Sequence, residues 1–588
     1  MSRLKLLPST SLIAAALLLA ACDRSSDAPT TTAEPAATRA GTSATGGAID
    51  AKDFADHVRT LASDEFGGRA PGSPGEEKTV EYLVSQFKKL GLKPGNGDSY
   101  VQTVPMVETT ANGDTTRLTL DINGKTRELD FGDEMVIGTR TGKPTVEIDD
   151  SQLVFVGYGV NAPEQGWNDY EGVDVKGKTV VMFVNDPGFR SQDDKLFEGK
   201  RMTYYGRWTY KYEEAARQGA AAALIIHDTD AASYGWDVVK NSWSGAQFDL
   251  PASVDPDPRL PAQGWITDAV ARSLLSDVGQ NLDTLYRTAN ERGFKAILLD
   301  AKMSLELNST SQEKSSNNVV AILPGSTRPD EAVVYMAHWD HLGDHAHEDE
   351  PAANNSAPID PNASKVEIAD AIYNGAIDNA TGVAGILEIA EAFTTQQPAP
   401  ERSVVFLAVT LEESGLLGSK YYVANPSIPL KDTVAVINLD AMSVLGKSRD
   451  ITVVGMGNSE LEDMLKEVAS EQGRVLTGEP TPQAGYYFRS DHFNFAKAGV
   501  PALYAKGGDD LVEGGAEAGQ KGQLAYRQDR YHQPADEFDE SWPLEGVVQD
   551  LEALYSVGKR LAGSAQWPTW YEGNPFRAAR EQSRPSAP

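Results

Sequence analysis

The sequence has little cysteine, few basic residues and no long apolar run. Cys22 is the only cysteine among 588 residues, so no disulfide can support the fold in an oxidising compartment. The chain contains 53 Lys and Arg against 85 Asp and Glu, a formal net charge of −32. Phosphate backbones and anionic lipids bind basic surfaces, so this balance argues against nucleic acid as a partner and against electrostatic attraction to a membrane. A Gly-x-Ser-x-Gly nucleophile elbow is also missing, which argues against a serine-based catalytic triad.

The N-terminal segment predicts export and lipid attachment. Residues 12–21 form an apolar run of ten residues after a basic start, too short to span a bilayer in the mature protein. Residues 1–21 resemble a bacterial lipoprotein signal peptide, cut before Cys22, which is then acylated. The alternative is an ordinary secretory signal with an incidental cysteine. The resemblance implies a cell-envelope protein that faces the periplasm and is anchored by lipid on Cys22, and Asp23 implies retention at the inner membrane.

Composition divides the rest of the chain into regions, and its length suggests two to four structural units. Residues 22–48 are rich in Ser, Thr, Ala, Pro and Gly, which predicts a flexible linker. Residues 49–135 are expected to be the first part of the main domain, with helices at 53–61 and 75–90. Residues 566–588 have the composition of a C-terminal tail.

Residues 136–297 have a different amino-acid composition, with frequent Gly, Pro, Trp and Tyr. Short β-branched runs at 153–156 and 179–184 are followed by a helix at 212–218 and a strand at 222–226. We interpret this region as an inserted β-rich domain. The segments VGYGV, VKGKTVVMFVND and EEAARQGAAAALIIHD resemble the protease-associated domain that is found inside several peptidases. The alternative is that the region is part of one larger fold.

Residues 298–565 have an α/β pattern and form the main part of the main domain. Strands are expected at 318–323, 332–337, 403–410 and 433–439, and helices at 380–395 and 459–472. Alternating strands and helices predict an α/β fold with a mostly parallel central sheet that helices flank on both faces. Ligands of such sheets bind at the carboxyl ends of the strands.

Metal-ligating side chains follow several of these strands. In chain order they are His338, Asp378, Glu413, Asp440 and His532. Imidazole and carboxylate groups are the ligands that a two-metal hydrolase uses, and one carboxylate can bridge the two ions. Asp378 lies among small residues before a helix, where it could share its oxygens between two cations. The alternative is an aspartate that only caps the helix.

Residues beside these ligands predict the rest of the chemistry. Glu412 directly precedes Glu413 at a strand end, so one glutamate can bind metal while the other holds a water and acts as general base. Asp340 is placed to accept the second N–H of the His338 imidazole and fix its ring.

Other titratable residues near the motifs have weaker signals. Asp536 could orient the imidazole of His532. The loop histidines after Asp340 are expected to be solvated; they are His341, His345 and His347. His492, in a Ser-Asp-His segment, is expected to be structural because no nucleophile elbow accompanies it.

The motifs together resemble those of one peptidase family. They are H-x-D, G-x-I-D-N-x-x-G, E-E-x-G-L-L-G-S, N-L-D, S-D-H and Y-H-x-x-x-D, in that order. The series resembles the di-zinc aminopeptidase and glutamate carboxypeptidase family, whose relatives include the transferrin receptor. The resemblance covers about residues 50–135 and 300–560, with the protease-associated domain inserted between them.

The resemblance implies a role for each motif residue. One zinc ion would be held by His338 and Asp440, the other by Glu413 and His532, and Asp378 would bridge them. Glu412 would be the general base. The oxyanion would be stabilised by Tyr487, as in the aminopeptidases, or by Tyr531, as in the glutamate carboxypeptidases, and the sequence leaves both open.

The resulting prediction is an aminopeptidase that hydrolyses N-terminal residues of peptides with a water bridging two zinc ions, although oxygen-rich sites also accept other divalent ions. A glutamate-carboxypeptidase-like exopeptidase is the alternative; it would need cations for the substrate carboxylate, and Arg489 is the one arginine within a site motif. A catalytically inactive receptor-like binding protein would not need Glu412 and all five ligands, and a glutaminyl-cyclase-like transferase uses one metal. The sequence leaves the oligomeric state open.

Overall fold

The computed structural model describes residues 49–191, 193–344 and 371–584. The predicted signal peptide, Cys22 and the linker lie outside these residues, as do His345 and His347. In the part of the chain that is described, none of the helices combines the length and the apolar character that a membrane span requires. The architecture is α/β, as predicted, with a central sheet and a second, β-rich region.

The central sheet has a parallel core with antiparallel strands added to it. Its strand order is β2-β13-β17-β14-β18-β21-β19-β20. The strands are β2 (Val101–Ala111), β13 (Ile297–Leu323), β14 (Arg328–His338), β17 (Arg402–Val409), β18 (Thr433–Asn438), β19 (Asp450–Val453), β20 (Val475–Gly478) and β21 (Ala502–Gly507). β14 runs parallel to both β17 and β18, so the three strands end at one edge. Every residue of β17 and β18 is buried, as expected for parallel strands that are covered on both faces.

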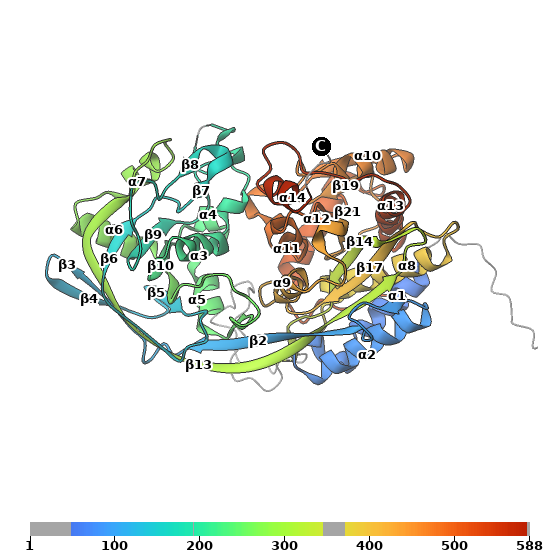
Figure 1. The fold of residues 1–588 in the computed structure, drawn as a ribbon, viewed down its shortest axis with the longest axis horizontal. Coiled ribbons are helices and arrows are strands. Elements are labelled where there is room, and N and C mark those ends of the chain that lie inside the picture. The colour runs from blue at the N-terminus through green and yellow to red at the C-terminus, as the bar shows by residue number, and fades with distance from the viewer. Residues whose placement is uncertain (1–48, 192, 345–370, 585–588) are drawn as a thin grey trace, which may run out of the picture. The chain divides into compact units, whose positions relative to one another are not determined.

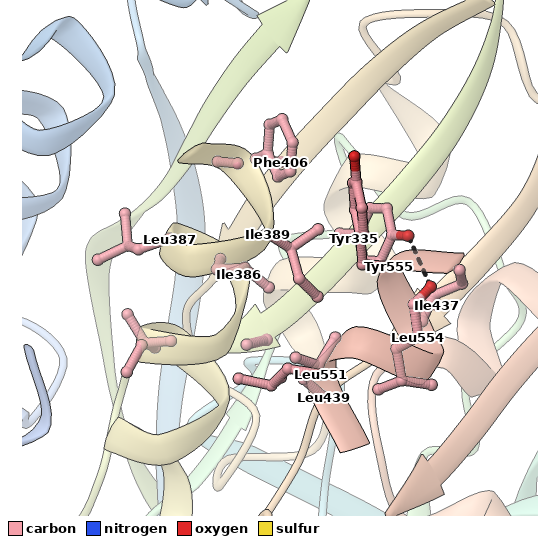
Figure 2. Packing of buried hydrophobic residues seen from close by; sticks show 14 of the residues in the cluster. Tyr335, Ile386, Leu387, Ile389, Phe406, Ile437, Leu439, Leu551, Leu554 and Tyr555 are labelled. Atoms are coloured by element: carbon pink, nitrogen blue, oxygen red, sulfur yellow. Dashed lines mark hydrogen bonds between the residues drawn. The ribbon is translucent and has the colours of Figure 1, made fainter. Parts of the chain in front are cut away.

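Helices cover both faces of this sheet. One face packs against α1 (Ala51–Leu61), α2 (Pro74–Lys89), α8 (Thr381–Thr395), α10 (Leu461–Glu471) and α13 (Glu545–Ala562). The other packs against α9 (Leu417–Ala424) and α11 (His492–Lys497). Figure 2 shows side chains of the first core, where the hydroxyl of Tyr335 donates to the backbone oxygen of Leu554 at 2.8 Å. Consecutive residues of β14, such as Tyr335 and Met336, point into opposite cores. This alternation is expected of a strand that is buried on both faces.

The long strand β13 connects the central sheet to a second sheet. Its first half pairs with β3 (Arg117–Ile122) and β6 (Thr145–Phe155), and its second half pairs with β2 and β17. Figure 1 shows β13 and β2 running side by side. The second sheet also contains β4 (Lys125–Leu129), β5 (Met135–Gly138), β9 (Thr179–Phe183), β10 (Ala222–Ile226) and β12 (Ala262–Ile266). Its cores include residues of α3 (Trp208–Arg217), α5 (Trp236–Ser244), α6 (Asp268–Asp277) and α7 (Leu282–Thr288).

The second sheet begins before residue 136, the predicted start of the insertion. β3 and β4 pair with each other, and β3 also pairs with β13 in this sheet. Leu118, Leu120 and Leu129 belong to its apolar core. Their alternation predicts a strand but does not show which sheet the strand joins, because pairing is set by long-range contacts.

Residues 566–584 pack against the central unit, so the predicted tail was wrong for them. The indole N–H of Trp570, which is buried, donates to the backbone oxygen of Gly499 at 2.9 Å. Within α14 (Arg577–Ser583), the guanidinium of Arg580 donates to the backbone oxygen of Thr433 at 2.9 Å. Single anchoring residues in a polar segment leave no periodic pattern, so the sequence did not reveal this docking.

Candidate metal centre

The five predicted ligands meet at the carboxyl edge of the parallel strands. His338 is the last residue of β14, Glu413 follows β17 and Asp440 follows β18. Asp378 lies in the turn before α8, and His532 follows α12 (Gly515–Asp529). Because β17, β14 and β18 are parallel neighbours, the residues at their ends are brought together from distant parts of the sequence.

Asp378 lies between two pairs of side chains. Its Oδ1 atom is 3.2 Å from Nε2 of His338, which is 3.7 Å from Oδ1 of Asp440. Its Oδ2 atom is 3.3 Å from Nε2 of His532, which is 3.2 Å from Oε2 of Glu413. The two oxygens of one carboxylate therefore face two histidine–carboxylate pairs, an arrangement that suits a carboxylate shared by two cations.

The donor set fits divalent metal ions. Both ring nitrogens of His532 are buried and make no hydrogen bond among the described residues, although Nε2 lies at ion-pair distance from Asp378 and Glu413. A buried polar atom without a partner is costly, and a metal ion is a partner that imidazole and carboxylate groups can share. Among the described residues, two groups of side chains have their ligand atoms within 4.8 Å of one another inside each group: His338 with Glu412 and Asp440, and His341 with Asp378 and Glu413.

Crowding of charges shifts the pKa values of these ligands. Burial alone would lower the pKa of His338, but Glu412, Asp378 and Asp440 outweigh it and the pKa is raised well above its usual value. Burial also opposes the rise at His532, whose pKa Glu413 and Asp378 raise to about 10. The neighbouring carboxylates therefore favour the protonated form of both imidazoles, and a metal ion bound there would compete with those protons.

Glu412 lies beside the two pairs. A carboxylate oxygen of Glu412 belongs to the first ligand-type group, with His338 and Asp440. Burial raises the pKa of Glu412 well above its usual value; His338 opposes this rise, whereas Glu413 and Asp440 add to it. A raised pKa suits a carboxylate that accepts and returns a proton near neutral pH.

Asp340 holds the backbone of Glu412 rather than the ring of His338. Nδ1 of His338 is 3.1 Å from the backbone oxygen of Asp340 and 3.9 Å from its carboxylate. That carboxylate accepts the backbone N–H of Glu412 at 3.2 Å. The predicted contact was wrong because the turn after β14 brings the carbonyl of Asp340, and not its side chain, next to the imidazole.

Asp536 holds the backbone of Asp378 rather than the ring of His532. Its carboxylate accepts the N–H groups of Ile377 and Asp378, each at 3.1 Å. Nδ1 of His532 has no hydrogen-bond partner in the described part of the chain. The predicted pairing was therefore wrong, and this aspartate fixes the turn that presents the shared carboxylate.

His341 was expected to be solvated, but it is buried inside the centre. It is 1% exposed, and its Nδ1 atom lies 2.8 Å from Oε1 of Glu413. Its imidazole is therefore a further ligand-type group for the pair of Asp378 and Glu413. The sequence contained one indication of this position: His341 follows His338 by three residues, in the same turn.

Arg69 was not singled out by its sequence, although it joins the two loops that hold ligands. It is 1% exposed and donates to four backbone oxygens. Nε bonds Trp339 at 2.8 Å and Nη2 bonds Gly375 at 2.9 Å, while Nη1 bonds Leu61 at 2.8 Å and Asn374 at 2.6 Å. The guanidinium therefore fixes the turn after His338 against the turn before Asp378.

Ser490 and His492 of the Ser-Asp-His segment have supporting contacts. The hydroxyl of Ser490 donates to Oδ2 of Asp440 at 2.5 Å and accepts a bond from the side chain of Asn438 at 2.8 Å. His492 packs against the ring of Tyr487, with centroids 4.6 Å apart, and burial lowers its pKa to about 3. His492 is thus a neutral packing residue.

The two tyrosines considered for the oxyanion lie in different surroundings. Tyr531 is 41% exposed, and its ring stacks on His532 with centroids 3.9 Å apart. The surrounding protein raises the pKa of Tyr531, and Asp378 and Glu413 add to the rise. Burial raises the pKa of the Tyr487 hydroxyl, and Glu462, which is not one of the proposed ligands, adds to the rise. Of these two candidates, Tyr531 is the one that lies beside a proposed ligand.

The residues that hold this centre match a known family. Residues 318–555 fit the family model for peptidase family M28. These residues are the part of the chain that is similar to peptidase family M28, and they are called the M28 region below. The M28 region contains all five predicted ligands and Glu412, which confirms the family that the motifs indicated.

Individual relatives match different shares of the chain. A probable zinc metalloprotease of Phaeosphaeria nodorum is 32% identical over 152 residues, 25% of this chain and 25% of the relative. This chain spans between 23% and 32% of the length of the first three curated relatives. A probable lipoprotein aminopeptidase of Mycobacterium tuberculosis, LpqL, is 23% identical over 523 residues, 85% of this chain and 82% of LpqL. A solved aminopeptidase from Aneurinibacillus sp. strain AM-1 has 20% identity and a TM-score of 0.47, with coverage of 88% of this chain and 95% of its own.

Proposed function

We propose that this protein is a zinc-dependent aminopeptidase that removes N-terminal residues from peptides. The observation that carries the proposal is the position of Asp378, whose two oxygens face two histidine–carboxylate pairs beside Glu412. The M28 match of residues 318–555 supports a metallopeptidase. The name of the relative LpqL, an aminopeptidase, supports action at the N-terminus.

The proposed ligand set holds two metal ions. It consists of His338 and Asp440, of His532 and Glu413, and of Asp378 shared between the pairs. Zinc bound at these groups supplies Lewis-acid chemistry, which polarises a peptide carbonyl and makes water more acidic.

Glu412 moves the proton in this proposal. Its carboxylate takes a proton from the attacking water and returns it to the nitrogen of the leaving amine. The hydroxyl of Tyr531, beside the ligands, donates to the oxyanion. Tyr487 is the second candidate for this role, but His492 lies against its ring and its hydroxyl is buried.

One pair of substrates tests the direction of cleavage. The purified mature protein is given a short peptide with a free amino terminus and the same peptide with an acetylated one. We expect cleavage of only the free peptide and its loss with a chelator. Cleavage of the acetylated form would assign the protein to the carboxypeptidase branch, and cleavage of neither by the metal-loaded protein would favour a binding role.

Metal content tests the ligand set. Asp378→Asn should lower the occupancy of both metals, because the shared carboxylate lies between both pairs. Elemental analysis after dialysis measures this directly. Two metals per chain in the variant would contradict the bridging assignment.

The envelope location is part of the same proposal. Lipid on Cys22 would anchor the mature chain at the periplasmic face of a membrane, and the inserted region would be a protease-associated domain that limits access to the site. The lipoprotein name of LpqL supports the anchor. Cys22→Ser should move the protein from the membrane fraction to the soluble fraction, and an unchanged distribution would argue against lipidation.

A further inference from the structure

A cleft of about 450 Å³ lies between the inserted region and the helices α9 and α11 of the M28 region. One wall comes from α3 and the loop 250–257, and the other comes from α9, α11 and the C-terminal residues 575–576. In Figure 1, α9 and α11 lie on the side of the central sheet that faces the inserted region. Small-molecule sites commonly have volumes of about 300–1,000 Å³, so the cleft is large enough to hold a ligand.

The cleft is separate from the metal centre. Both helices begin near that centre, since Glu413 lies four residues before α9 and Ser490 lies two residues before α11. The side chains that line the cleft come from farther along the helices, and they include Val423 and Lys497. None of the five proposed metal ligands lines it. A molecule bound in this cleft would therefore leave the metal centre free.

The two walls of the cleft present opposite charges to each other. On α9, the ammonium of Lys420 lies 2.6 Å from Oδ2 of Asp255 and 3.5 Å from Oδ2 of Asp257. On α11, the ammonium of Lys497 lies 3.3 Å from Oε1 of Glu213. The M28 wall therefore supplies cations, and the wall of the inserted region supplies carboxylates.

The protein uses only part of the binding capacity of two of these groups. An ammonium has three N–H donors, and that of Lys497 makes one hydrogen bond, to Glu213. The carboxylate of Asp257 makes no hydrogen bond in the described part of the chain and has only an ion-pair contact. Arg217, which also lines the cleft, is already bonded to Glu214 of its own helix at 2.8 Å. Lys497 and Asp257 can therefore each bind a further charged group.

Apolar side chains complete the lining of the cleft. Leu250 and Val254 come from the inserted region, Val423 comes from α9 and Phe576 comes from the C-terminal residues. A ligand that suits this lining offers a carboxylate, an ammonium and an apolar group together, because apolar walls with a few placed polar groups are typical of small-molecule sites. An amino acid with an aliphatic side chain has all three groups, and so has a dipeptide of such residues.

We propose that this cleft binds the zwitterion of an apolar amino acid or dipeptide. Its carboxylate binds the ammonium of Lys497, its ammonium binds the carboxylate of Asp257, and its side chain lies among the apolar residues of the walls. The site itself does not depend on the proposed function. Only the source of the ligand rests on that function, since an aminopeptidase releases free amino acids and takes up short peptides.

A label inside the cleft tests its occupancy without involving the metal centre. Ala424 is exposed and lines the cleft, so a chain with Cys22→Ser and Ala424→Cys has its only thiol there. We expect L-leucine to slow the reaction of this thiol with N-ethylmaleimide in the metal-loaded protein. Leucine methyl ester has no carboxylate and N-acetyl-leucine has no ammonium. Each should bind at least about tenfold more weakly, the scale of one charge-assisted hydrogen bond.

Leucyl-leucine distinguishes the two sources of the zwitterion. It is added to the labelled chain that also contains Glu412→Gln, so that the dipeptide persists during the measurement. Stronger protection by leucine than by leucyl-leucine would identify the released amino acid as the ligand. The reverse order would identify the peptide.

Lys497→Gln and Asp257→Asn should each weaken the protection by leucine about tenfold. The control is Lys466→Gln, which alters an exposed lysine of α10 on the opposite face of the central sheet and should leave the protection unchanged. All three variants should keep the wild-type unfolding temperature, because ion pairs of partly exposed side chains contribute little to stability.

The proposal would be overturned if neither leucine nor the dipeptide protected the thiol, or if leucine and its two derivatives protected it equally. Protection that is unchanged in both Lys497→Gln and Asp257→Asn would overturn it as well. Cleavage of peptides is measured separately in the same chains. Normal cleavage without protection would reject only the cleft site, whereas protection without any cleavage would reject only the proposed function.

Discussion

Two clusters of buried charge in this molecule are built in opposite ways. In the inserted region, Lys211 is fully buried and donates to the backbone oxygen of Tyr158 at 2.6 Å. It is attracted by two buried aspartates, Asp169 and Asp186. Asp169 accepts the N–H of Val160 at 2.9 Å and the indole N–H of Trp167 at 2.8 Å. No side-chain atom of Lys211, Asp169 or Asp186 is buried without a hydrogen-bond partner in the described part of the chain.

In the cluster at the carboxyl ends of β14, β17 and β18, several buried polar atoms have no hydrogen-bond partner among the described residues. Nδ1 of His532, Nε2 of His341 and Oδ2 of Asp340 are buried without a hydrogen bond in the described residues, and Nε2 of His532 has only ion-pair contacts with Asp378 and Glu413. Burial is similar in both clusters, so burial does not distinguish them. The comparison teaches that a closed network of buried charge supports a fold, whereas an open one marks a place for a ligand. Each variant below tests that distinction.

Glu412→Gln has the largest expected effect. Loss of the general base should lower kcat at least about a hundredfold, the usual lower bound for such a group. Metal content and the unfolding temperature should stay at wild-type values, because the open cluster serves chemistry rather than the fold. Steady-state kinetics with elemental analysis measure both quantities.

Glu401→Gln is the matched control for this variant. Glu401 lies at the other end of β17, where it is exposed and pairs with Arg328. Its replacement should leave turnover unchanged. Near-normal activity of Glu412→Gln would remove Glu412 from its assigned role.

Lys211→Met should damage the fold and not the chemistry. Removing this cation leaves two buried carboxylates without a counter-charge, which costs about 3–5 kcal/mol of unfolding free energy. Chemical denaturation of wild type and variant measures the difference. The control, Lys176→Met, alters an exposed lysine of the same region and should cost less than about 0.5 kcal/mol. An equal, small cost for both would contradict the view of the insertion cluster as a structural network.

Arg69→Lys should lower both the free energy of unfolding and the metal affinity, because the four hydrogen bonds of Arg69 hold the two turns that carry ligands. An ammonium cannot reproduce four hydrogen bonds from one planar group, and buried carbonyls that lose a donor cost about 1–3 kcal/mol. Metal affinity should also fall about tenfold, since residues that orient ligands contribute on that scale. Competition with a fluorescent chelator measures the affinity.

Arg59→Lys is the control for Arg69. Arg59 is partly exposed and pairs with Asp56 and Glu540, and such pairs contribute little. Wild-type metal affinity in Arg69→Lys would show that the two ligand turns hold their positions without the guanidinium.

The pH dependence of stability tests the cluster of the inserted region by itself. Burial raises the pKa of Asp169 to about 7, above its unfolded value near 4, so its stabilising contribution is full below about pH 4 and is lost as pH rises to about 7. Burial lowers the pKa of Lys211 to about 7, so its contribution is lost as pH falls from above about 10.5 to about 7. The difference in unfolding free energy between wild type and Asp169→Asn should therefore shrink between pH 4 and pH 7. A difference that is constant over this range would contradict the raised pKa.

Much of the fold followed from the sequence because its signals are local. The run 403–410 is apolar from 404 to 409 and forms most of β17, and the helical spacing at 380–395 forms α8, one residue from its predicted start. The boundaries that failed depend on partners. Residues 117–129 form β3 and β4, which join the second sheet because β3 pairs with β13. The indole of Trp570 is held by a hydrogen bond to a backbone oxygen 71 residues earlier in the chain.

The sequence by itself determined which chemistry is available. His338, Asp378, Glu413, Asp440 and His532 were identified because metal chemistry requires those residue types and parallel strands bring their ends together. Only the tertiary structure decided that His341 is buried beside Glu413 and that Arg69 spans 306 residues to reach Gly375. The physical reason is that the residue type fixes which groups a side chain can bind. Whether the protein already supplies those groups depends on burial and on contacts with segments that are distant in the sequence.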